Sequence, residues 1–164
     1  MNRMFHALGL FALLGCSLAA TPALAQDEDN EVPELRVATL DGPVFDLSAK
    51  RGQWVVVNYW ATWCSPCLKE MPDLRAFAES RDDVALIGLA YEDISAEEMR
   101  AFLREHPAGY PIAIVDVYNP PADFPAPRGL PMTWLIAPEG QVAKRFLGPV
   151  TGRDLAQAIS AALP

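Results

Sequence analysis

The chain has 164 residues, of which 51% are hydrophobic, and its formal net charge is −8. This length suffices for one domain with its own hydrophobic core. The acidic balance opposes binding to a nucleic-acid backbone, which requires clustered Lys and Arg residues. The sequence shows no Gly-rich phosphate loop and no internal repeat, so we expect neither a nucleic-acid partner nor a bound cofactor.

The first 25 residues predict a signal peptide for export. Arg3 supplies a short positive start, an apolar run follows over residues 7–20, and small residues precede a cleavage site after Ala25. The apolar run is too short to span a bilayer comfortably. A second cut is possible, because "LLGC" at residues 13–16 resembles a bacterial lipoprotein box and would leave a lipidated Cys16. We therefore expect export to the periplasm, either as a free protein or as a lipoprotein anchored through Cys16.

Cleavage after Ala25 would remove one basic residue, Arg3, and leave 12 basic and 21 acidic residues, a net charge of −9. Residues 26–33, "QDEDNEVP", are acidic and poor in apolar side chains, which predicts a flexible leader. One domain is expected over residues 34–164.

A small hairpin and a buried strand are predicted at the start of this domain. Residues 34–40 alternate between apolar and polar side chains, and a "DGP" turn leads into residues 44–47. Residues 48–53 predict a short helical turn or loop. The continuous apolar run "WVVVNYW" at residues 54–60 is typical of a strand that is covered on both faces.

A helix is predicted from Cys64 to about Ser80, because its apolar residues follow helical spacing. They are Leu68, Met71, Leu74, Phe77 and Ala78. The polar neighbours Lys69 and Glu70 are expected on the solvated face of this helix.

The chain then alternates between strands and helices. Residues 84–91 predict a second buried strand, and residues 95–106 predict a helix that begins with a capping box of Ser95 and Glu98. A short strand is expected over residues 110–116.

A hairpin and a final helix complete the predicted domain. Residues 132–138 and 141–148 form the hairpin across the turn "PEG", and residues 151–163 are amphipathic. Parallel strands followed by an antiparallel hairpin define the α/β class, with a central mixed sheet flanked by helices on both faces.

Two cysteines remain after export, since Cys16 lies in the signal segment. A disulfide between Cys64 and Cys67 would persist in an oxidising compartment, but it would close almost no loop and so constrain the unfolded chain very little. Redox chemistry and metal binding remain as roles. The N–H groups and the dipole at the start of a helix stabilise a thiolate, which favours redox chemistry at this position.

The position of each cysteine predicts its role. Cys64 stands at the helix start and should be the exposed attacking thiol, whereas Cys67 lies one turn further in and should be the buried resolving thiol. Pro66 fits the first helical turn, where its missing N–H does no harm. A structural zinc site generally needs four ligands, and these two thiols with the distant His106 are too few; a copper site of the three stays open.

The segment "NYWATWCSPCLKEMP" resembles the active-site segment of the thioredoxin superfamily, and specifically of its exported TlpA/ResA-like thiol–disulfide oxidoreductases. The resemblance runs from about Glu34 to Leu163, and its most specific parts are "WCSPC", "RGLPMTWLI" and "DGPVFDLSAKRGQWVVVNYW". It implies a thioredoxin-like fold with an N-terminal β-hairpin and an inserted helix and strand. It also implies that Cys64 attacks and Cys67 resolves.

The family carries a cis-proline that faces the cysteines, and the resemblance puts it at Pro131. This bond would present the backbone of Leu130 to an extended peptide that carries a cysteine. Trp63, Ser65 and Pro66 complete the expected substrate-binding residues. Trp63 is expected to cover the disulfide, with simple packing as the alternative.

ResA-like members have a glutamate just beyond the second strand of the main sheet, and Glu92 matches it in "LAYED". A partly buried carboxylate has a raised pKa and could relay the proton of Cys67. Asp93 could compete for this role, and a solvated carboxylate at a strand end is the alternative. Thioredoxin has a buried Asp in its central strand, where this chain offers only Asn58, so the relay falls to Glu92.

Residues 116–131, "DVYNPPADFPAPRGLP", depart from the family, which often has a short helix ending in "YGV" here. Five prolines in this segment forbid much helix. We expect a loop that contributes to binding a specific partner.

Together these features predict a monomeric periplasmic protein that reduces disulfides of exported client proteins. A reductase in an oxidising compartment must be recharged, so an integral membrane thiol donor is expected as a second partner. The resemblance suggests apocytochrome c or a copper-site assembly protein as client, as in cytochrome c biogenesis. The cytochrome-specific branch, however, has a glutamate where this chain has Met132.

Two alternatives stay open. A thiol peroxidase would need the Pro and Thr of the peroxiredoxin loop, and Val57 and Ala61 stand in their places. A copper carrier would use Cys64, Cys67 and His106, although such carriers usually space their cysteines by three residues.

Overall fold

The computed structural model describes residues 32–40 and 42–163. The predicted signal peptide, Cys16 and most of the acidic leader lie outside these residues. Val32 is exposed, but Pro33, at the end of the predicted leader, is already buried. Within the described ranges, no helix has the length and apolar character needed to cross a membrane.

The predicted N-terminal hairpin is confirmed. Strand β1 (Arg36–Val37) pairs antiparallel with β2 (Phe45–Asp46), and the short 3-10 helix η2 (Ser48–Lys50) follows. Leu35 and Phe45 are buried against the main sheet. The hairpin therefore belongs to the hydrophobic core of the domain.

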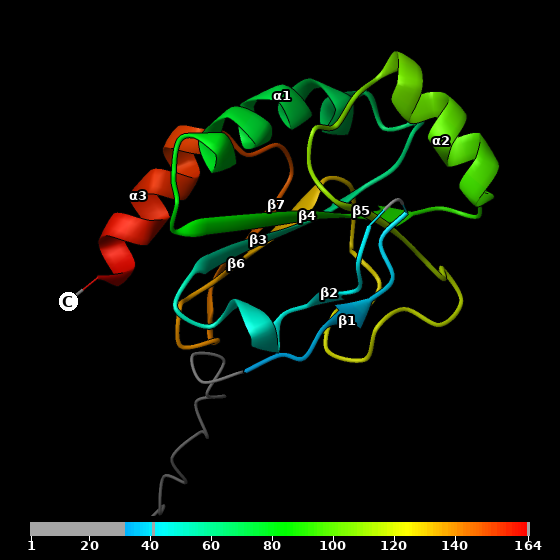
Figure 1. The fold of residues 1–164 in the computed structure, drawn as a ribbon. Coiled ribbons are helices and arrows are strands. Elements are labelled where there is room, and N and C mark those ends of the chain that lie inside the picture. Colours follow the sequence, from blue (N-terminus) through cyan, green and yellow to red (C-terminus); the bar gives the residue numbers. More distant parts are fainter. Residues whose placement is uncertain (1–31, 41, 164) are drawn as a thin grey trace, which may run out of the picture.

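A five-stranded mixed sheet forms the centre of the molecule, in the order β5-β4-β3-β6-β7 (Figure 1). The parallel part consists of β3 (Trp54–Trp60), β4 (Val84–Tyr91) and β5 (Ile112–Val115). Strands β6 (Met132–Ile136) and β7 (Val142–Leu147) form the predicted hairpin, and β6 pairs antiparallel with β3. All seven residues of β3 are buried, as expected for a central strand with both faces covered.

In the described part of the chain, three α-helices pack on this sheet: α1 (Ser65–Glu79), α2 (Ala96–Glu105) and α3 (Gly152–Ala162). The capping box predicted for α2 is present, since Ser95 and Glu98 each bond the other's backbone N–H. A second capping box, formed by Thr151 and Asp154, begins α3.

The prediction of helices on both faces of the sheet is wrong. In Figure 1 all three α-helices lie above the sheet and the hairpin lies below it. The hydrophobic core agrees with this arrangement. On one face of the sheet, Val56 of β3 packs with Leu74 of α1 and Leu155 of α3, whereas the other face contacts Phe45 and Phe124. The cause is the strand order. Because β4 and β5 are added on the same side of β3, two right-handed crossovers place α1 and α2 on one face.

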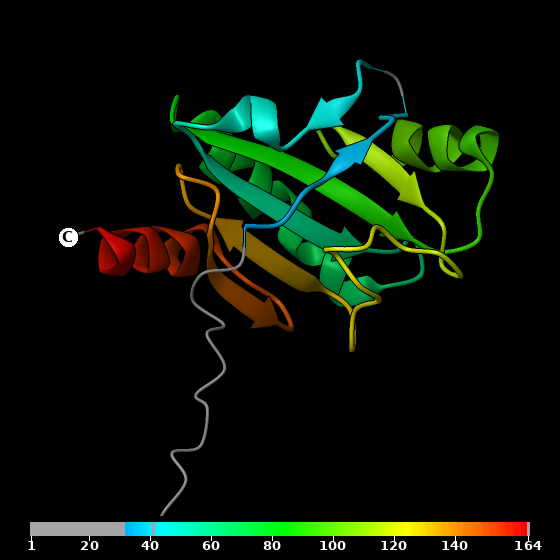
Figure 2. The same cartoon turned by 90° about the horizontal axis from the view of Figure 1, so that it is seen from below.

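The proline-rich segment helps to cover the second face. Phe124 is fully buried, its ring lies 4.8 Å from that of Trp134, and its carbonyl oxygen accepts a hydrogen bond of 2.5 Å from the Tyr59 hydroxyl. Residues 116–131 contain no helix, as their prolines predict. Figure 2, seen from below, shows this yellow segment running beside the hairpin across the sheet.

Candidate active site: a disulfide at the start of a helix

The two cysteines form a disulfide at the junction of β3 and α1. Cys64 is the N-cap residue of α1, and the backbone N–H of Cys67 donates to the Cys64 sulfur at 3.3 Å. Pro66 stands in the first helical turn, as predicted. This contact is the one that would stabilise a Cys64 thiolate, because an N-cap atom receives the free N–H groups of the first turn.

Cys64 is more exposed than Cys67, as predicted, but it is far less exposed than the prediction of an exposed thiol implies. Cys67 is fully buried and Cys64 has 4% of its surface exposed, so Cys64 is the more accessible of the two but is not an exposed residue in the disulfide form. Its neighbours Ser65 and Pro66 are exposed. Trp63 is 69% exposed. That it covers the disulfide stays a prediction, with simple packing as the alternative.

The peptide bond between Leu130 and Pro131 is cis, as the resemblance implied. Pro131 is buried, and Leu130 is half-buried and packs against the cluster that contains Cys64 and Cys67. The Pro131 carbonyl oxygen accepts a hydrogen bond from the backbone of Gly148. The predicted substrate-binding backbone therefore lies beside the disulfide.

Glu70 is not on the solvated face of α1, and this prediction is wrong. Its exposed fraction is only 6%. One carboxylate oxygen accepts from the side-chain amide of Asn58 at 2.8 Å, and the other accepts from the backbone N–H of Val150 at 2.8 Å. A buried carboxylate requires such partners. Lys69, the other residue expected on the solvated face, is exposed.

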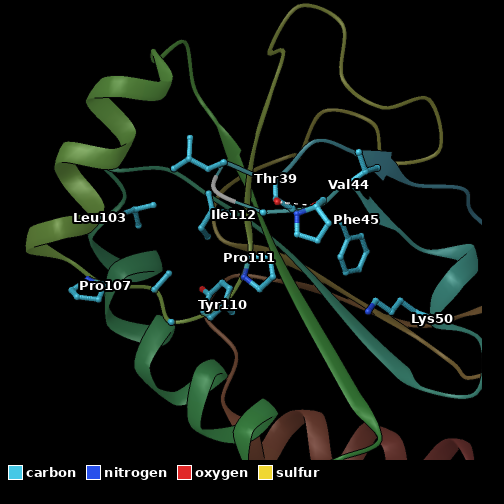
Figure 3. Close-up of a pocket in the computed structure, with 14 residues that line it drawn as sticks. Thr39, Val44, Phe45, Lys50, Leu103, Pro107, Tyr110, Pro111 and Ile112 are labelled. Carbon is cyan, nitrogen blue, oxygen red and sulfur yellow. Dashed lines mark hydrogen bonds between the residues drawn. The ribbon is translucent and has the colours of Figure 1, made fainter.

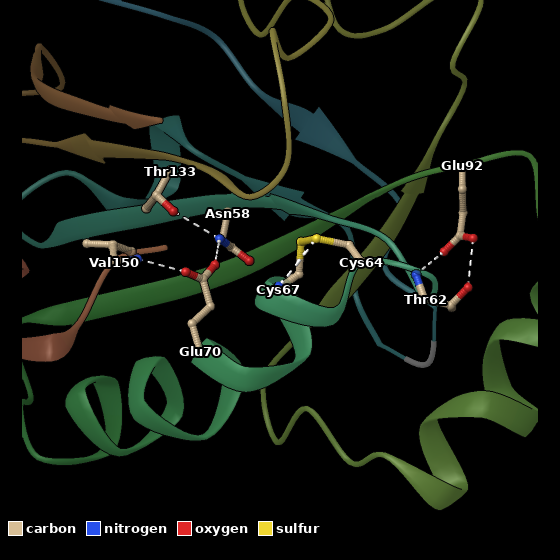
Figure 4. Close-up of a disulfide and its surroundings, with 8 residues drawn as sticks. All are labelled: Asn58, Thr62, Cys64, Cys67, Glu70, Glu92, Thr133 and Val150. Atoms are coloured by element: carbon tan, nitrogen blue, oxygen red, sulfur yellow. Dashed lines mark hydrogen bonds between the residues drawn. A yellow bond between two sulfur atoms is a disulfide. The ribbon is translucent and has the colours of Figure 1, made fainter. Parts of the chain in front are cut away.

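Burial raises the pKa of Glu70 from 4.5 to about 7, although the hydrogen bonds from Val150 and Asn58 lower it. Glu70 lies three residues after Cys67 on α1 and thus on the same side of the helix. Figure 4 shows its carboxylate between α1 and the strands of the sheet, directed toward Asn58 and Val150 on the side where the disulfide lies. A carboxyl that titrates near neutral pH beside the resolving cysteine suits proton transfer.

The spacing of buried residues in α1 could have revealed Glu70. The buried positions are Cys67, Glu70, Met71 and Leu74. They follow the i, i+3, i+4, i+7 pattern of one helix face, and an acidic residue inside that pattern marks a buried carboxylate.

The predicted relay residue, Glu92, lies on the other side of the disulfide in Figure 4. It is half-buried, and its carboxylate accepts hydrogen bonds from the backbone N–H and the hydroxyl of Thr62 at 2.7 and 2.8 Å. Glu92 thus anchors the segment between β3 and Cys64. Its role as a proton relay stays a prediction, and Asp93 is exposed.

His106 does not join the cysteines. It is the exposed C-cap residue of α2, and its ring lies 4.5 Å from that of Phe102. Among the described residues, no three His, Cys, Asp or Glu side chains gather where they could hold a metal ion. The copper site of Cys64, Cys67 and His106 is therefore not assembled in this conformation.

A cavity of about 440 Å³ lies apart from the disulfide, between the N-terminal hairpin and the segment that joins α2 to β5 (Figure 3). Apolar residues such as Phe45, Leu103 and Ile112 form most of its lining, with Lys50 at one end. Neither cysteine and no predicted substrate-binding residue lines it.

A mixed sheet whose central strand leads into a Cys-x-x-Cys disulfide at a helix start, with a cis-proline beside it, defines a thioredoxin-like thiol–disulfide oxidoreductase. The chain belongs to the AhpC/TSA family, which matches residues 29–145, more than half of its length.

Characterised relatives agree with this class. The thiol-disulfide oxidoreductase ResA of Bacillus subtilis (strain 168) is 27% identical over 161 residues, which cover 92% of this chain and 88% of ResA. The thiol:disulfide interchange protein HelX of Rhodobacter capsulatus is 29% identical over 150 residues, which cover 90% of this chain and 82% of HelX.

A solved structure shows the same fold. The crystal structure of a DsbF homologue from Corynebacterium diphtheriae has a TM-score of 0.69 at 25% identity, over 93% of this chain and 99% of that one. These likenesses support the thioredoxin-like fold and the resemblance to ResA-like proteins.

Proposed function

We propose that this protein is a periplasmic thiol–disulfide oxidoreductase that reduces disulfides of exported client proteins. The observation that carries the proposal is the Cys64–Cys67 pair, with Cys64 at the N-cap of α1 and Cys67 sealed behind it. A helix start lowers the pKa of a thiol, and the thiolate is the nucleophile in disulfide exchange.

The reaction uses the two cysteines in sequence. The Cys64 thiolate attacks one sulfur of the client disulfide, so a mixed disulfide forms and the other client sulfur leaves as a thiolate, which takes up a proton. Cys67 then gives up its proton and attacks Cys64, which releases the second client thiolate and leaves the Cys64–Cys67 disulfide. Two electrons pass to the client.

Glu70 supports the second step. Its carboxylate lies one turn from Cys67 and its pKa is about 7, so it can accept the proton that Cys67 must lose before it attacks. Glu92, held by Thr62, is the second carboxylate candidate for this transfer.

The client would bind beside the cis-proline. Leu130 offers backbone groups to an extended segment of the client, in the manner of an added strand, and Trp63, Ser65 and Pro66 form the exposed rim on the other side of Cys64. Reductive turnover in an oxidising compartment requires recharging by an integral membrane thiol donor. We propose a monomeric protein, exported by its N-terminal segment, whose clients are apocytochrome c or copper-site assembly proteins.

Thiol peroxidase activity is the weaker candidate. Val57 and Ala61 are both buried apolar residues in and just after β3, and they replace the Pro and the Thr hydroxyl of the peroxiredoxin loop. A peroxide-consumption assay on the reduced protein separates the two functions, since we expect no turnover of peroxide.

The decisive experiment traps the mixed disulfide with a client and measures the midpoint potential of the Cys64–Cys67 pair. We expect Cys67→Ser to accumulate a mixed disulfide with a disulfide-bearing client, because the resolving thiol is gone, and Cys64→Ser to form none. A Cys64→Ser protein that still reduces the client would overturn the proposal. A midpoint potential near roughly −270 mV supports a reductant, whereas one near roughly −120 mV would make the protein an oxidant.

A further inference from the structure

Asn58 carries a buried hydrogen-bond acceptor without a donor. Its side chain is fully buried on the helix-covered side of β3. Its amide nitrogen donates to Glu70 at 2.8 Å and to the Thr133 hydroxyl at 2.9 Å. Among the described residues, no group donates to its Oδ1 oxygen. An unsatisfied buried acceptor is costly in a folded protein, so this oxygen requires an explanation.

The position of Asn58 indicates a donor. Its partner Glu70 lies three residues after Cys67 on α1. The Asn58 amide therefore lies between β3 and the helical turn that begins at Cys67. Figure 4 shows the amide nitrogen directed to Glu70 and Thr133 and the amide oxygen on the side of Cys67. Cys67 is fully buried as well.

The two redox states differ in whether Cys67 can donate a hydrogen bond. A disulfide sulfur carries no hydrogen, so Cys67 cannot donate in the oxidised protein. A reduced Cys67 carries an S–H group that is buried and needs an acceptor. Glu70 already accepts one hydrogen bond at each oxygen, whereas Oδ1 of Asn58 accepts none.

We propose that Asn58 is a positioning residue whose Oδ1 accepts the hydrogen bond of the Cys67 thiol in the reduced protein. Reduction by a dithiol donor breaks the S–S bond and transfers two electrons; one donor proton stays on the Cys67 sulfur, Cys64 remains a thiolate, and the second proton is released. The bond to Asn58 then favours the dithiol form and holds Cys67 protonated. This inference rests on the proposed function, since it concerns the same cysteine pair.

The first test observes the thiol directly. In the full chain with Cys16→Ser and Cys64→Ser, Cys67 is the sole thiol, because the sequence has three cysteines. We expect its infrared S–H stretching band to lie below that of the same protein unfolded in urea, and Asn58→Leu to move the band back to the unfolded position. Thr133→Val removes the other Asn58 contact and should leave the band in place.

Glu70→Gln separates the two candidate acceptors. If Asn58 accepts the bond, the band stays shifted in this variant; a band that moves with Glu70→Gln and not with Asn58→Leu overturns the inference. If Asn58→Leu does not fold, Asn58→Ala replaces it. A Cys67 band at the unfolded position in the unsubstituted Asn58 protein also overturns the inference, whatever the variants do.

The second test measures the redox equilibrium with glutathione. Asn58→Leu should shift the equilibrium toward the disulfide by roughly tenfold, the effect expected for one unsatisfied buried acceptor, and Thr133→Val should shift it much less. An unchanged equilibrium in Asn58→Leu contradicts the inference. Client reduction is assayed separately, so a protein that shows the shifted band but reduces no client refutes the proposed function and not the hydrogen bond.

Discussion

Glu70 is the residue whose ionisation should be visible in the stability of the whole protein. Its pKa in the folded protein is about 7, above its ordinary value of 4.5, because it is buried. Its contribution to stability is therefore fully present below about pH 4.5 and is lost as the pH rises through about 7. The loss amounts to about 3 kcal/mol, from a pKa difference of about 2.5 units.

Glu70→Gln should remove this pH dependence. We expect urea unfolding of the oxidised protein to show the wild type losing about 3 kcal/mol relative to Glu70→Gln between pH 4.5 and 8. Glu79→Gln is the matched control, since Glu79 is an exposed residue of the same helix, and its curve should run parallel to the wild type. Parallel curves for Glu70→Gln as well would mean that Glu70 titrates as an ordinary carboxyl.

Trp63 is the residue for which exposure itself suggests a role. Its large indole is 69% exposed immediately before Cys64, and exposed aromatic residues beside a reactive group are common contact residues for partners. We expect Trp63→Ala to lower kcat/KM for a protein disulfide by about tenfold, the effect of about 1.4 kcal/mol of lost binding.

A small disulfide serves as the internal control for Trp63. Reduction of oxidised glutathione uses Cys64 without an extended contact surface, so its rate should change little in Trp63→Ala. Equal losses for both substrates would show that the indole acts on the cysteine and not on the client. The free energy of unfolding should change by less than about 0.5 kcal/mol, as for other surface substitutions.

The Cys-x-x-Cys motif located the cysteines and the cap position, because their geometry follows from neighbouring residues, and the resemblance to ResA-like proteins placed the cis-proline at Pro131. The motif did not identify Glu70 as buried, although its spacing with Cys67, Met71 and Leu74 places it on the same face of α1. The partners that keep this carboxylate buried are Asn58, 12 residues away, and Val150, 80 residues away. Such contacts exist only once the sheet is assembled. The sequence shows only that Glu70 is charged, and a charged residue on a helix is normally expected on the solvated face.

At the scale of elements, caps fix where helices begin. The Ser95 side chain accepts from the Glu98 N–H at 3.2 Å, and the Glu98 carboxylate accepts from the Ser95 N–H at 3.0 Å. We expect Ser95→Ala to cost about 1 kcal/mol of stability, the usual effect of a lost N-cap. Urea unfolding at neutral pH measures it.

Ser160→Ala provides the comparison for Ser95. The Ser160 hydroxyl bonds the Ala156 carbonyl within α3, so its loss removes a hydrogen bond but no cap, and should change stability by less than about 0.5 kcal/mol. Equal effects of the two substitutions would contradict the importance of the cap.

Strands with unbroken apolar runs were predicted with their bounds, as β3 and β4 show. The bounds of β5 were not. The strand was predicted over residues 110–116 and spans Ile112–Val115, since Pro111 cannot donate to a ladder and Tyr110 packs with the clusters below α1. The amino-acid composition of a segment predicts that it forms a strand, whereas the residues at which the strand begins and ends depend on contacts with the rest of the fold.

At the scale of the molecule, the face of the sheet that each helix covers depends on the order of the strands, and no local sequence pattern predicts that order. The sequence predicted the parallel strands and the hairpin, but not that β4 and β5 extend the sheet in one direction from β3. That direction places the helices on one face. The hairpin β1–β2 and the segment of residues 116–131 must then cover the other.

The anchor of that segment is Phe124. Its ring is fully buried against Trp134, and the Tyr59 hydroxyl of the central strand donates to its carbonyl oxygen. Loss of a buried Phe side chain costs about 3–5 kcal/mol because the cavity left behind collapses only in part. We expect Phe124→Ala to lower the free energy of unfolding in urea by this amount and to make residues 116–131 the first site of cleavage in limited proteolysis.

Tyr118 provides a matched control in the same segment. It is an aromatic residue that is 86% exposed, so Tyr118→Ala should change stability by less than about 0.5 kcal/mol and leave the cleavage pattern as in the wild type. If Phe124→Ala proved as mild as Tyr118→Ala, the segment would be an attached loop and not part of the core. A large loss confined to Phe124 would establish that this proline-rich segment does on one face of the sheet what the α-helices do on the other: it keeps the central strand β3, which leads into α1, out of water.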